Sequence, residues 1–95
     1  MSAVDPDLPS IPGYVFETAL GSGGMATVYR ARQLALDRPV AVKVLRAFGR
    51  DADELNQRFE QEAKLIAALD HPHIVAIFEV TRTDAGDACY VMPLL

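Results

Sequence analysis

Two charged residues interrupt apolar patterns in this sequence and are the first candidates for chemistry. Lys43 stands in the otherwise apolar run Val40–Leu45, and Glu62 falls on a helical stripe with Phe59 and Ile66. A buried charge needs a partner of opposite sign, and a helix that packs back on its sheet could pair the two. Taken singly, a strand lysine usually reaches water and a helix glutamate usually faces solvent. One ion pair would account for both positions.

A glycine-rich segment upstream of the lysine offers a site for an anion. Gly21–Ala26 has the sequence GSGGMA, and main-chain amides without side chains beside them can lie close to phosphate oxygens. The pattern alone is weak, because a hairpin turn can also be rich in glycine. A dinucleotide-binding loop would open a helix, whereas Thr27–Arg32 alternates like a strand, and no Gly-Lys-Ser/Thr follows as in a P-loop.

Hydrophobic periodicity predicts the elements that position these residues. Strands are expected at 14–20, 27–32, 40–45, 74–80 and 88–92, and a helix at about 52–69. Pro72 follows the helix, and Asp84–Asp87 is expected to be a turn. The expected fold class is α+β, with a five-stranded antiparallel sheet and one packed helix. Residues 1–12, with three prolines, are expected to form a disordered leader before a domain at 13–95.

Composition narrows the classes of partner. The 95 residues, 51% of them hydrophobic, suffice for one small domain, and a net charge of −4 without a basic run argues against nucleic acid. No apolar run is long enough to span a bilayer. The single cysteine, Cys89, fits a reducing cytoplasm and a buried packing role. We interpret His71 and His73 as structural and Asp84 and Asp87 as turn residues, and we expect no metal site.

Three motifs taken together resemble those of protein kinases. Leu20–Tyr29 (LGSGGMATVY), Val40–Lys43 (VAVK) and Glu62 are similar to the glycine-rich loop, the third-strand lysine and the helix-C glutamate of that family. The segments RFEQE (58–62) and HPHIV (71–75) resemble bacterial serine/threonine kinases in particular. The resemblance covers residues 14–95. It implies the N-terminal lobe of a kinase, ended at the hinge with the C-terminal lobe absent.

The resemblance also implies an ATP site. Lys43 would hold the α- and β-phosphates, Glu62 would orient Lys43, and Met92 matches the gatekeeper before the hinge. Pro93 stands where most relatives have an acidic residue, but the hinge contact there uses a carbonyl, which proline keeps. The implied ATP-binding residues are Leu20, Gly21, Ser22, Gly23, Gly24, Met25, Ala26, Val28, Ala41, Lys43, Met92, Pro93 and Leu95, with Val28 and Ala41 on either side of the adenine.

The motifs that complete catalysis do not occur in this sequence. Kinases position the substrate hydroxyl and bind Mg²⁺ through H-R-D-x-x-x-x-N and D-F-G, so we expect these 95 residues alone to be inactive. The complete enzyme would transfer phosphate from ATP to serine or threonine of a protein substrate. Tyrosine preference and a membrane anchor elsewhere stay open. A non-catalytic, kinase-lobe-like binding or regulatory module is the alternative, and the strand after the loop argues against a nicotinamide-binding protein.

Overall fold

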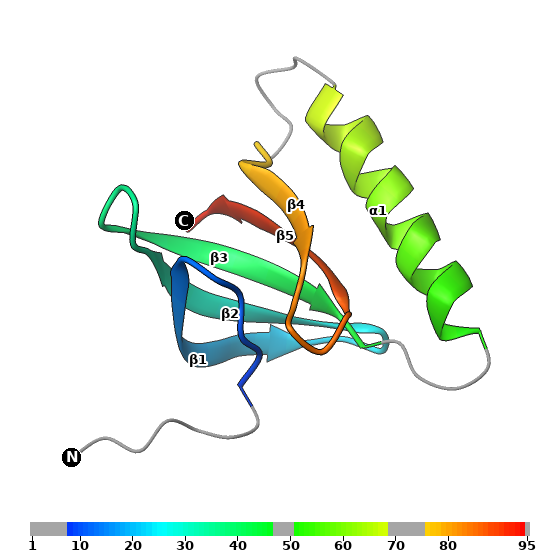
Figure 1. Cartoon of the computed structure of the whole chain (residues 1–95), viewed down its shortest axis with the longest axis horizontal. Helices are drawn as coiled ribbons and strands as arrows, with labels where there is room; N and C mark the ends of the chain where they lie inside the picture. The colour runs from blue at the N-terminus through cyan, green and yellow to red at the C-terminus, as the bar shows by residue number, and fades with distance from the viewer. Residues whose placement is uncertain (1–7, 47–50, 69–75, 95) are drawn as a thin grey trace.

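In this computed structural model, the described residues, 8–46, 51–68 and 76–94, form five strands and one helix. The elements are β1 (Tyr14–Ser22), β2 (Ala26–Gln33), β3 (Arg38–Leu45), α1 (Ala52–Ala68), β4 (Glu79–Arg82) and β5 (Ala88–Pro93). All strand pairs are antiparallel, in the order β1-β2-β3-β5-β4, and α1 lies along one side of the sheet (Figure 1). The structure therefore confirms the predicted α+β class.

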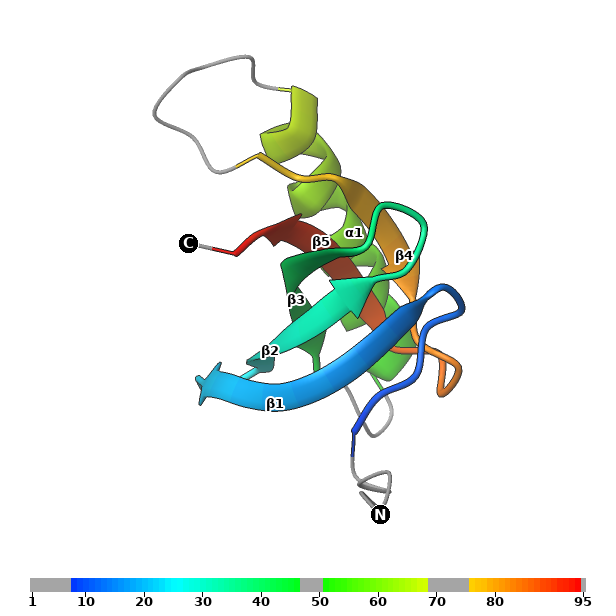
Figure 2. The same ribbon diagram turned by 90° about the vertical axis from the view of Figure 1, so that its left-hand side faces the viewer.

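The two faces of β3 have different surroundings. The buried cluster consists of Ile11, Ala31, Val40, Val42, Val44, Cys89 and Val91, and Tyr14, Phe16 and Tyr29 pack against it. Because side chains alternate along a strand, the three valines of β3 share the face of this cluster and Lys43 points to the other face. Figure 2 shows the twist of the sheet, with β1 in front and α1 behind the strands. Lys43 therefore lies on the side of the sheet that carries the helix.

The segment before β1 is part of the fold. Ile11 is 4% exposed and belongs to the buried cluster, and Ser10 O accepts a hydrogen bond from Asp84 N at 2.8 Å. The expectation of a disordered leader up to Pro12 is therefore wrong for Ile11. A single isoleucine between prolines has no periodicity, so its burial depends on contacts with strands far along the chain. Residues 1–7 lie outside the described part.

The fourth strand begins later than expected. A strand was predicted at 74–80, but β4 spans Glu79–Arg82, and positions 74 and 75 lie outside the described residues. The predicted turn is confirmed, since Thr83 N donates to Asp87 O at 2.9 Å and Gly86 has the left-handed φ of 92° that glycine tolerates. This short turn fixes the register of the hairpin, and pairing therefore continues up to Arg82. The hydrophobic run alone did not contain that information.

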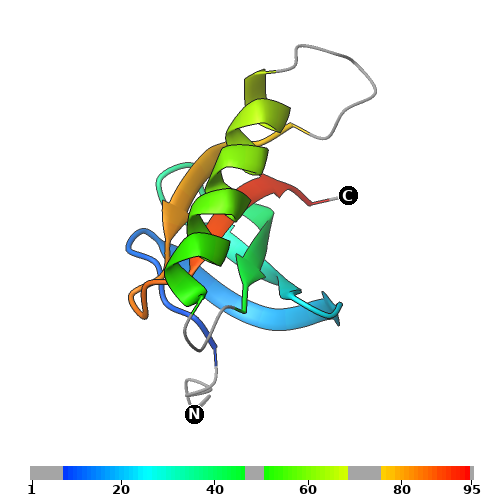
Figure 3. The ribbon, with the colours of Figure 1, turned by 90° about the vertical axis from the view of Figure 1, so that its right-hand side faces the viewer.

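The helix follows its prediction and docks on β4 and β5. It spans Ala52–Ala68, and position 69 lies outside the described residues. Its buried residues are Asn56 and Ala63, and the ring of Phe59 stacks on that of Tyr90 with 5.3 Å between centroids. Figure 3 shows α1 crossing in front of β4 and β5. The docking surface of α1 is thus the outer half of the sheet, away from β1.

Candidate functional site

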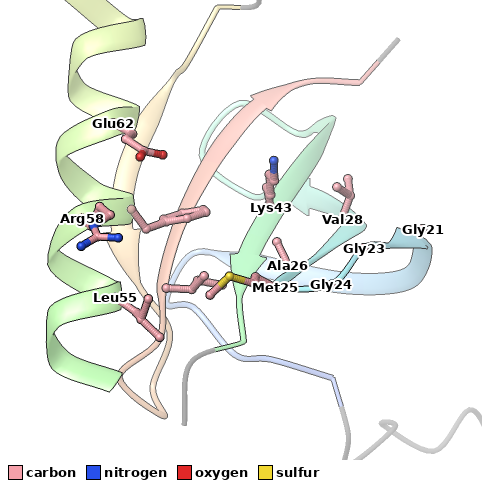
Figure 4. Close-up of a pocket in the computed structure, with 12 residues that line it drawn as sticks. Gly21, Gly23, Gly24, Met25, Ala26, Val28, Lys43, Leu55, Arg58 and Glu62 are labelled. Carbon is pink, nitrogen blue, oxygen red and sulfur yellow. The ribbon is translucent and has the colours of Figure 1, made fainter. Parts of the chain in front are cut away.

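A cavity of about 620 Å³ lies between the glycine-rich loop, β3 and α1 (Figure 4). It is lined by Gly21, Gly23, Gly24, Met25, Ala26, Val28, Lys43, Leu45, Leu55, Arg58, Phe59 and Glu62. The fold therefore brings the loop, the lysine and the glutamate, which are separate in sequence, to one space. Eight of the residues expected from sequence to form the site line it.

Lys43 occupies the middle of the sheet. Its neighbours across the strands are Val28 on β2 and Tyr90 on β5, and its side chain is half-buried. The Nζ atom is 6.0 Å from the centroid of the Tyr90 ring, which is the outer limit of a cation–π contact. Among the described residues, no carboxylate lies within ion-pair distance of this amine. The cation therefore faces the cavity without an anionic partner from that part of the chain.

Glu62 faces the cavity from the helix, but it is exposed. The expectation that it lies buried on the helical stripe is wrong, and within the described residues it forms no ion pair with Lys43. The centre of the packed face is Asn56 and Ala63, and Glu62 leaves the helix about 100° from Ala63. It therefore stands at the edge of that face. A spacing of three and four residues does not distinguish the edge of a packed face from its centre.

The glycine-rich loop is a closed hairpin with free space beside it. Gly23 N donates to Ala26 O at 2.9 Å, and Arg46 donates from Nη2 to Gly23 O. A Cβ atom built on Gly21, Gly23 or Gly24 would meet nothing within 4 Å, and none of the three has a positive φ. Neither packing nor backbone conformation thus requires glycine at these positions. The space beside these glycines belongs to the cavity that Lys43 also lines.

Of the two residues expected beside the adenine, Val28 lines this cavity and Ala41 does not. Leu20, Ser22, Ala41, Met92 and Pro93 are absent from its lining, and Leu95 lies outside the described residues. Ala41 is 5% exposed and pairs with Met92 across β3 and β5, so these two stay adjacent in the sheet. The cavity therefore corresponds to the phosphate end of the expected site together with a space under α1.

Sequence reasoning missed four lining residues. Leu45 stands two positions after Lys43, and strand alternation could have placed it on the same face. Leu55 and Phe59 were assigned to the helix stripe but not to the site, and Arg58 lies one turn before Glu62. Arg58 Nη2 is 3.6 Å from Glu54 Oε1 on the exposed side of the helix. No sequence pattern distinguished it from an ordinary surface arginine.

The remaining candidates behave as structural residues where they are described. Cys89 is fully buried, and burial raises the pKa of its thiol to about 12. His71 and His73 lie outside the described residues. Over the ranges that the structure describes, no group of three or more His, Cys, Asp or Glu side chains is arranged to hold a metal ion. The helix described here is too short and too polar to cross a membrane.

Comparison with known proteins identifies the class to which this fold and cavity belong. Residues 14–94 match the protein kinase domain, so the chain belongs to the protein kinase family, and its sheet and helix form the N-terminal lobe of that domain. This confirms the predicted family.

Relatives of this chain include bacterial serine/threonine kinases. The chain is 40% identical over 79 residues to serine/threonine-protein kinase PrkC of Bacillus subtilis, an alignment that covers 83% of this chain and 12% of the relative. It is 44% identical over 81 residues to PknB of Mycobacterium tuberculosis, covering 83% and 13%. With PknJ of the same species the identity is 52% over 68 residues, covering 70% and 11%. The chain thus spans a small part of the length of these relatives.

Proposed function

We propose that this chain binds the phosphates of ATP between the glycine-rich loop and Lys43, as the nucleotide-binding lobe of a serine/threonine protein kinase. One observation carries the proposal. Three glycines that neither packing nor φ requires border a cavity, and a half-buried lysine without a described carboxylate partner points into it. An anion that fits close to the backbone explains both features.

The chemistry of the lining suits a polyphosphate. The Lys43 ammonium can donate charge-assisted hydrogen bonds to phosphate oxygens, and the loop amides can donate from the other side. Glu62 lies across the cavity, where it can orient the lysine once α1 approaches β3. Val28 and Ala41 supply apolar surface for adenine, and the main-chain carbonyl of Pro93 can accept a hydrogen bond from it at the hinge. In this arrangement the chain supplies positioning and charge neutralisation, and the kinase motif that positions a substrate hydroxyl, H-R-D-x-x-x-x-N, is not in this sequence.

The kinases PrkC and PknB extend well beyond the part that this chain matches, which is 12% and 13% of their length. We infer that the complete protein transfers the γ-phosphoryl group of ATP to serine or threonine of a protein substrate, with Mg²⁺ as a cofactor. The described residues do not form a carboxylate cluster that fits Mg²⁺, and the kinase motifs that supply its ligands are not in this sequence. A cytoplasmic location is proposed for this lobe, because its lone cysteine is buried as a free thiol.

A nucleotide titration tests the proposal. The ¹⁵N-labelled chain should bind ATP at about millimolar Kd, about 4 kcal/mol, because one lobe contacts the nucleotide and water still reaches the phosphates. Lys43→Ala should weaken binding about tenfold by removing the cation in the cavity. Lys64→Ala removes the other lysine of the chain, which does not line the cavity, and should leave Kd unchanged.

Gly23→Val separates ligand binding from folding. A Cβ at Gly23 meets nothing within 4 Å in the free chain, so the melting temperature should stay the same. Its side chain would occupy space that the phosphates need, so the affinity for ATP should fall. Equal titrations for Gly23→Val, Lys43→Ala and the unsubstituted chain would place ATP elsewhere. A loss with Lys64→Ala as large as that with Lys43→Ala would mean that only net charge matters.

A further inference from the structure

Arg82 joins α1 to the β4–β5 hairpin through a bidentate ion pair. Its Nη2 atom is 2.8 Å from Glu60 Oε1 and its Nε atom is 3.2 Å from Glu60 Oε2. A third nitrogen, Nη1, donates to Gly86 O in the β4–β5 turn at 3.2 Å. Bidentate pairs between guanidinium and carboxylate fix orientation as well as distance, and this pair lowers the pKa of Glu60. One side chain therefore connects the helix, the strand and the turn.

The apolar contact of α1 is too small to fix the helix by itself. Most helices are held by a broad apolar face, whereas the buried side chains of α1 are Asn56 and Ala63. Leu65 is 69% exposed, and Phe59 is half-buried against Tyr90. Leu55 and Ile66 are also only half-buried, so the described apolar contacts alone fix the rotation of the helix weakly. Polar contacts must therefore contribute much of what sets its rotation.

The ion pair also determines where Glu62 points. Glu60 and Glu62 are two residues apart, so their side chains leave the helix about 160° apart around its axis. When Arg82 holds Glu60 over β4, Glu62 is directed to the opposite edge of the helix, where it lines the cavity with Lys43. Rolling the helix in either direction would move both carboxylates together. Fixing one therefore fixes the other.

We propose that Arg82 is a positioning residue, which holds Glu60 and thereby sets the rotation of α1 that directs Glu62 into the cavity beside Lys43. The effect of Arg82 on ATP affinity rests on the proposed nucleotide site, whereas its effect on the rotation of α1 does not. Without the guanidinium, α1 keeps the hydrogen bonds of Asn56 at its first turns and loses the contact that orients its middle turn, so Phe59 is no longer held against Tyr90. Binding of ATP then includes the additional cost of ordering the helix.

The test compares two arginines in the full chain. Arg82→Gln removes the proposed positioning pair. Arg32→Gln removes an ion pair to Asp37, with Nη1 at 3.1 Å from Oδ1, and both arginine side chains are 39% exposed. Arg82→Gln should accelerate hydrogen exchange at the amides of α1, such as that of Ala63, several-fold and should weaken ATP binding about threefold to tenfold. Arg32→Gln should change neither quantity.

Two further variants distinguish positioning from general destabilisation. The charge exchange Glu60→Arg with Arg82→Glu should recover the exchange protection that Arg82→Gln loses. In a Glu62→Gln background, Arg82→Gln should have little further effect on ATP affinity, because the residue acts through Glu62. Additive losses in that double variant, unchanged exchange in Arg82→Gln, or tighter ATP binding by Arg82→Gln would each overturn the proposal.

The outcome for the helix is independent of the outcome for the nucleotide. If the unsubstituted chain binds no ATP, the proposed nucleotide site is wrong. The exchange rates of α1 and the nuclear Overhauser contacts between the rings of Phe59 and Tyr90 still decide whether Arg82 fixes the helix. Loss of these contacts in Arg82→Gln, and not in Arg32→Gln, is the expected result. Retention of both in Arg82→Gln refutes the positioning role whatever ATP does.

Discussion

The single substitution Asn56→Ala should lower the free energy of unfolding of the chain. Its Oδ1 accepts a hydrogen bond from Ala88 N at 2.5 Å, and its Nδ2 donates to Ala52 O at 2.9 Å. Asn56 is 3% exposed and Ala88 is fully buried. In Asn56→Ala the amide of Ala88 therefore loses its side-chain acceptor at a place that water does not reach. The link between α1 and the start of β5 is lost with it.

The magnitude follows from two opposing effects. A buried main-chain donor left without a partner costs about 1–3 kcal/mol. Alanine is a better helix former than asparagine and returns about 0.5 kcal/mol. The net loss should be about 0.5–2.5 kcal/mol. For a domain of this size, 1 kcal/mol corresponds to about 4–8 °C, so the melting temperature should fall by roughly 2–20 °C.

Thermal and urea unfolding, followed by far-ultraviolet circular dichroism, measure this loss. Gln57→Ala is the matched control, because Gln57 is the next residue of the same helix and is exposed. Its change should stay within about 0.5 kcal/mol. If Asn56→Ala and Gln57→Ala unfold at the same temperature, the hydrogen bond to Ala88 does not contribute to stability and the proposed docking of α1 is wrong.

Two further predictions concern pH. Arg82 lowers the pKa of Glu60 below its usual value of 4.5. The difference in unfolding free energy between the unsubstituted chain and Arg82→Gln should therefore be constant above pH 4.5 and should shrink below it, as Glu60 takes up a proton. Urea unfolding at several pH values measures this difference. Burial raises the pKa of Cys89 to about 12 from 9.0, so stability should decrease as the pH rises above 9, where the unfolded thiol ionises and the folded one does not. At pH 8, a thiol reagent should modify Cys89 in urea and leave it unmodified in the native chain, and rapid native modification would contradict its burial.

Local patterns predicted most of the architecture. Strand alternation located β2, and a run that is apolar apart from Lys43 located β3. The spacing of Leu55, Phe59 and Ile66 gave a helix whose start agrees with the structure. The turn residues between Asp84 and Asp87 indicated the last hairpin correctly. Each of these signals lies within about ten residues, where the period of the backbone is visible in the sequence. The glycine-rich loop and Lys43 were placed at one site by the resemblance to protein kinases, and in the structure the pairing of Val28 with Lys43 between β2 and β3 brings them together.

Contacts between distant segments were not predictable from such patterns. Ile11 is buried because it packs under strands that occur later in the chain, and the start of β4 depends on its register with β5. Glu60 and Arg82 pair across two elements, and each looks like an ordinary surface residue in sequence. Arg58 joins the cavity because α1 has one particular rotation. These features depend on how the helix and strands pack on one another, and the hydrophobic periodicity of the sequence does not specify that packing.

The position of α1 on the sheet explains why Lys43 and Glu62 form no ion pair among the described residues. The ion pair at Arg82 and the contact at Asn56 hold α1 over β4 and β5, whereas Lys43 lies on β3, two strands from β4 in the sheet. Two strand spacings are roughly 10 Å. The ring of Tyr90 lies on the intervening strand, stacked on Phe59 and 6.0 Å from the Lys43 amine.

Closure of the gap between Lys43 and Glu62 must therefore involve the aromatic stack. Moving Glu62 to Lys43 requires α1 to shift toward β3, and Phe59 would then slide over Tyr90 or displace it. Loss of ring contact costs about 0.5–1.5 kcal/mol, which is comparable to one exposed ion pair and so opposes closure in the free chain. A phosphate group bound at Lys43 would change this balance through its charge. The aromatic stack thus lies between the helix and the lysine as the contact that closure has to rearrange.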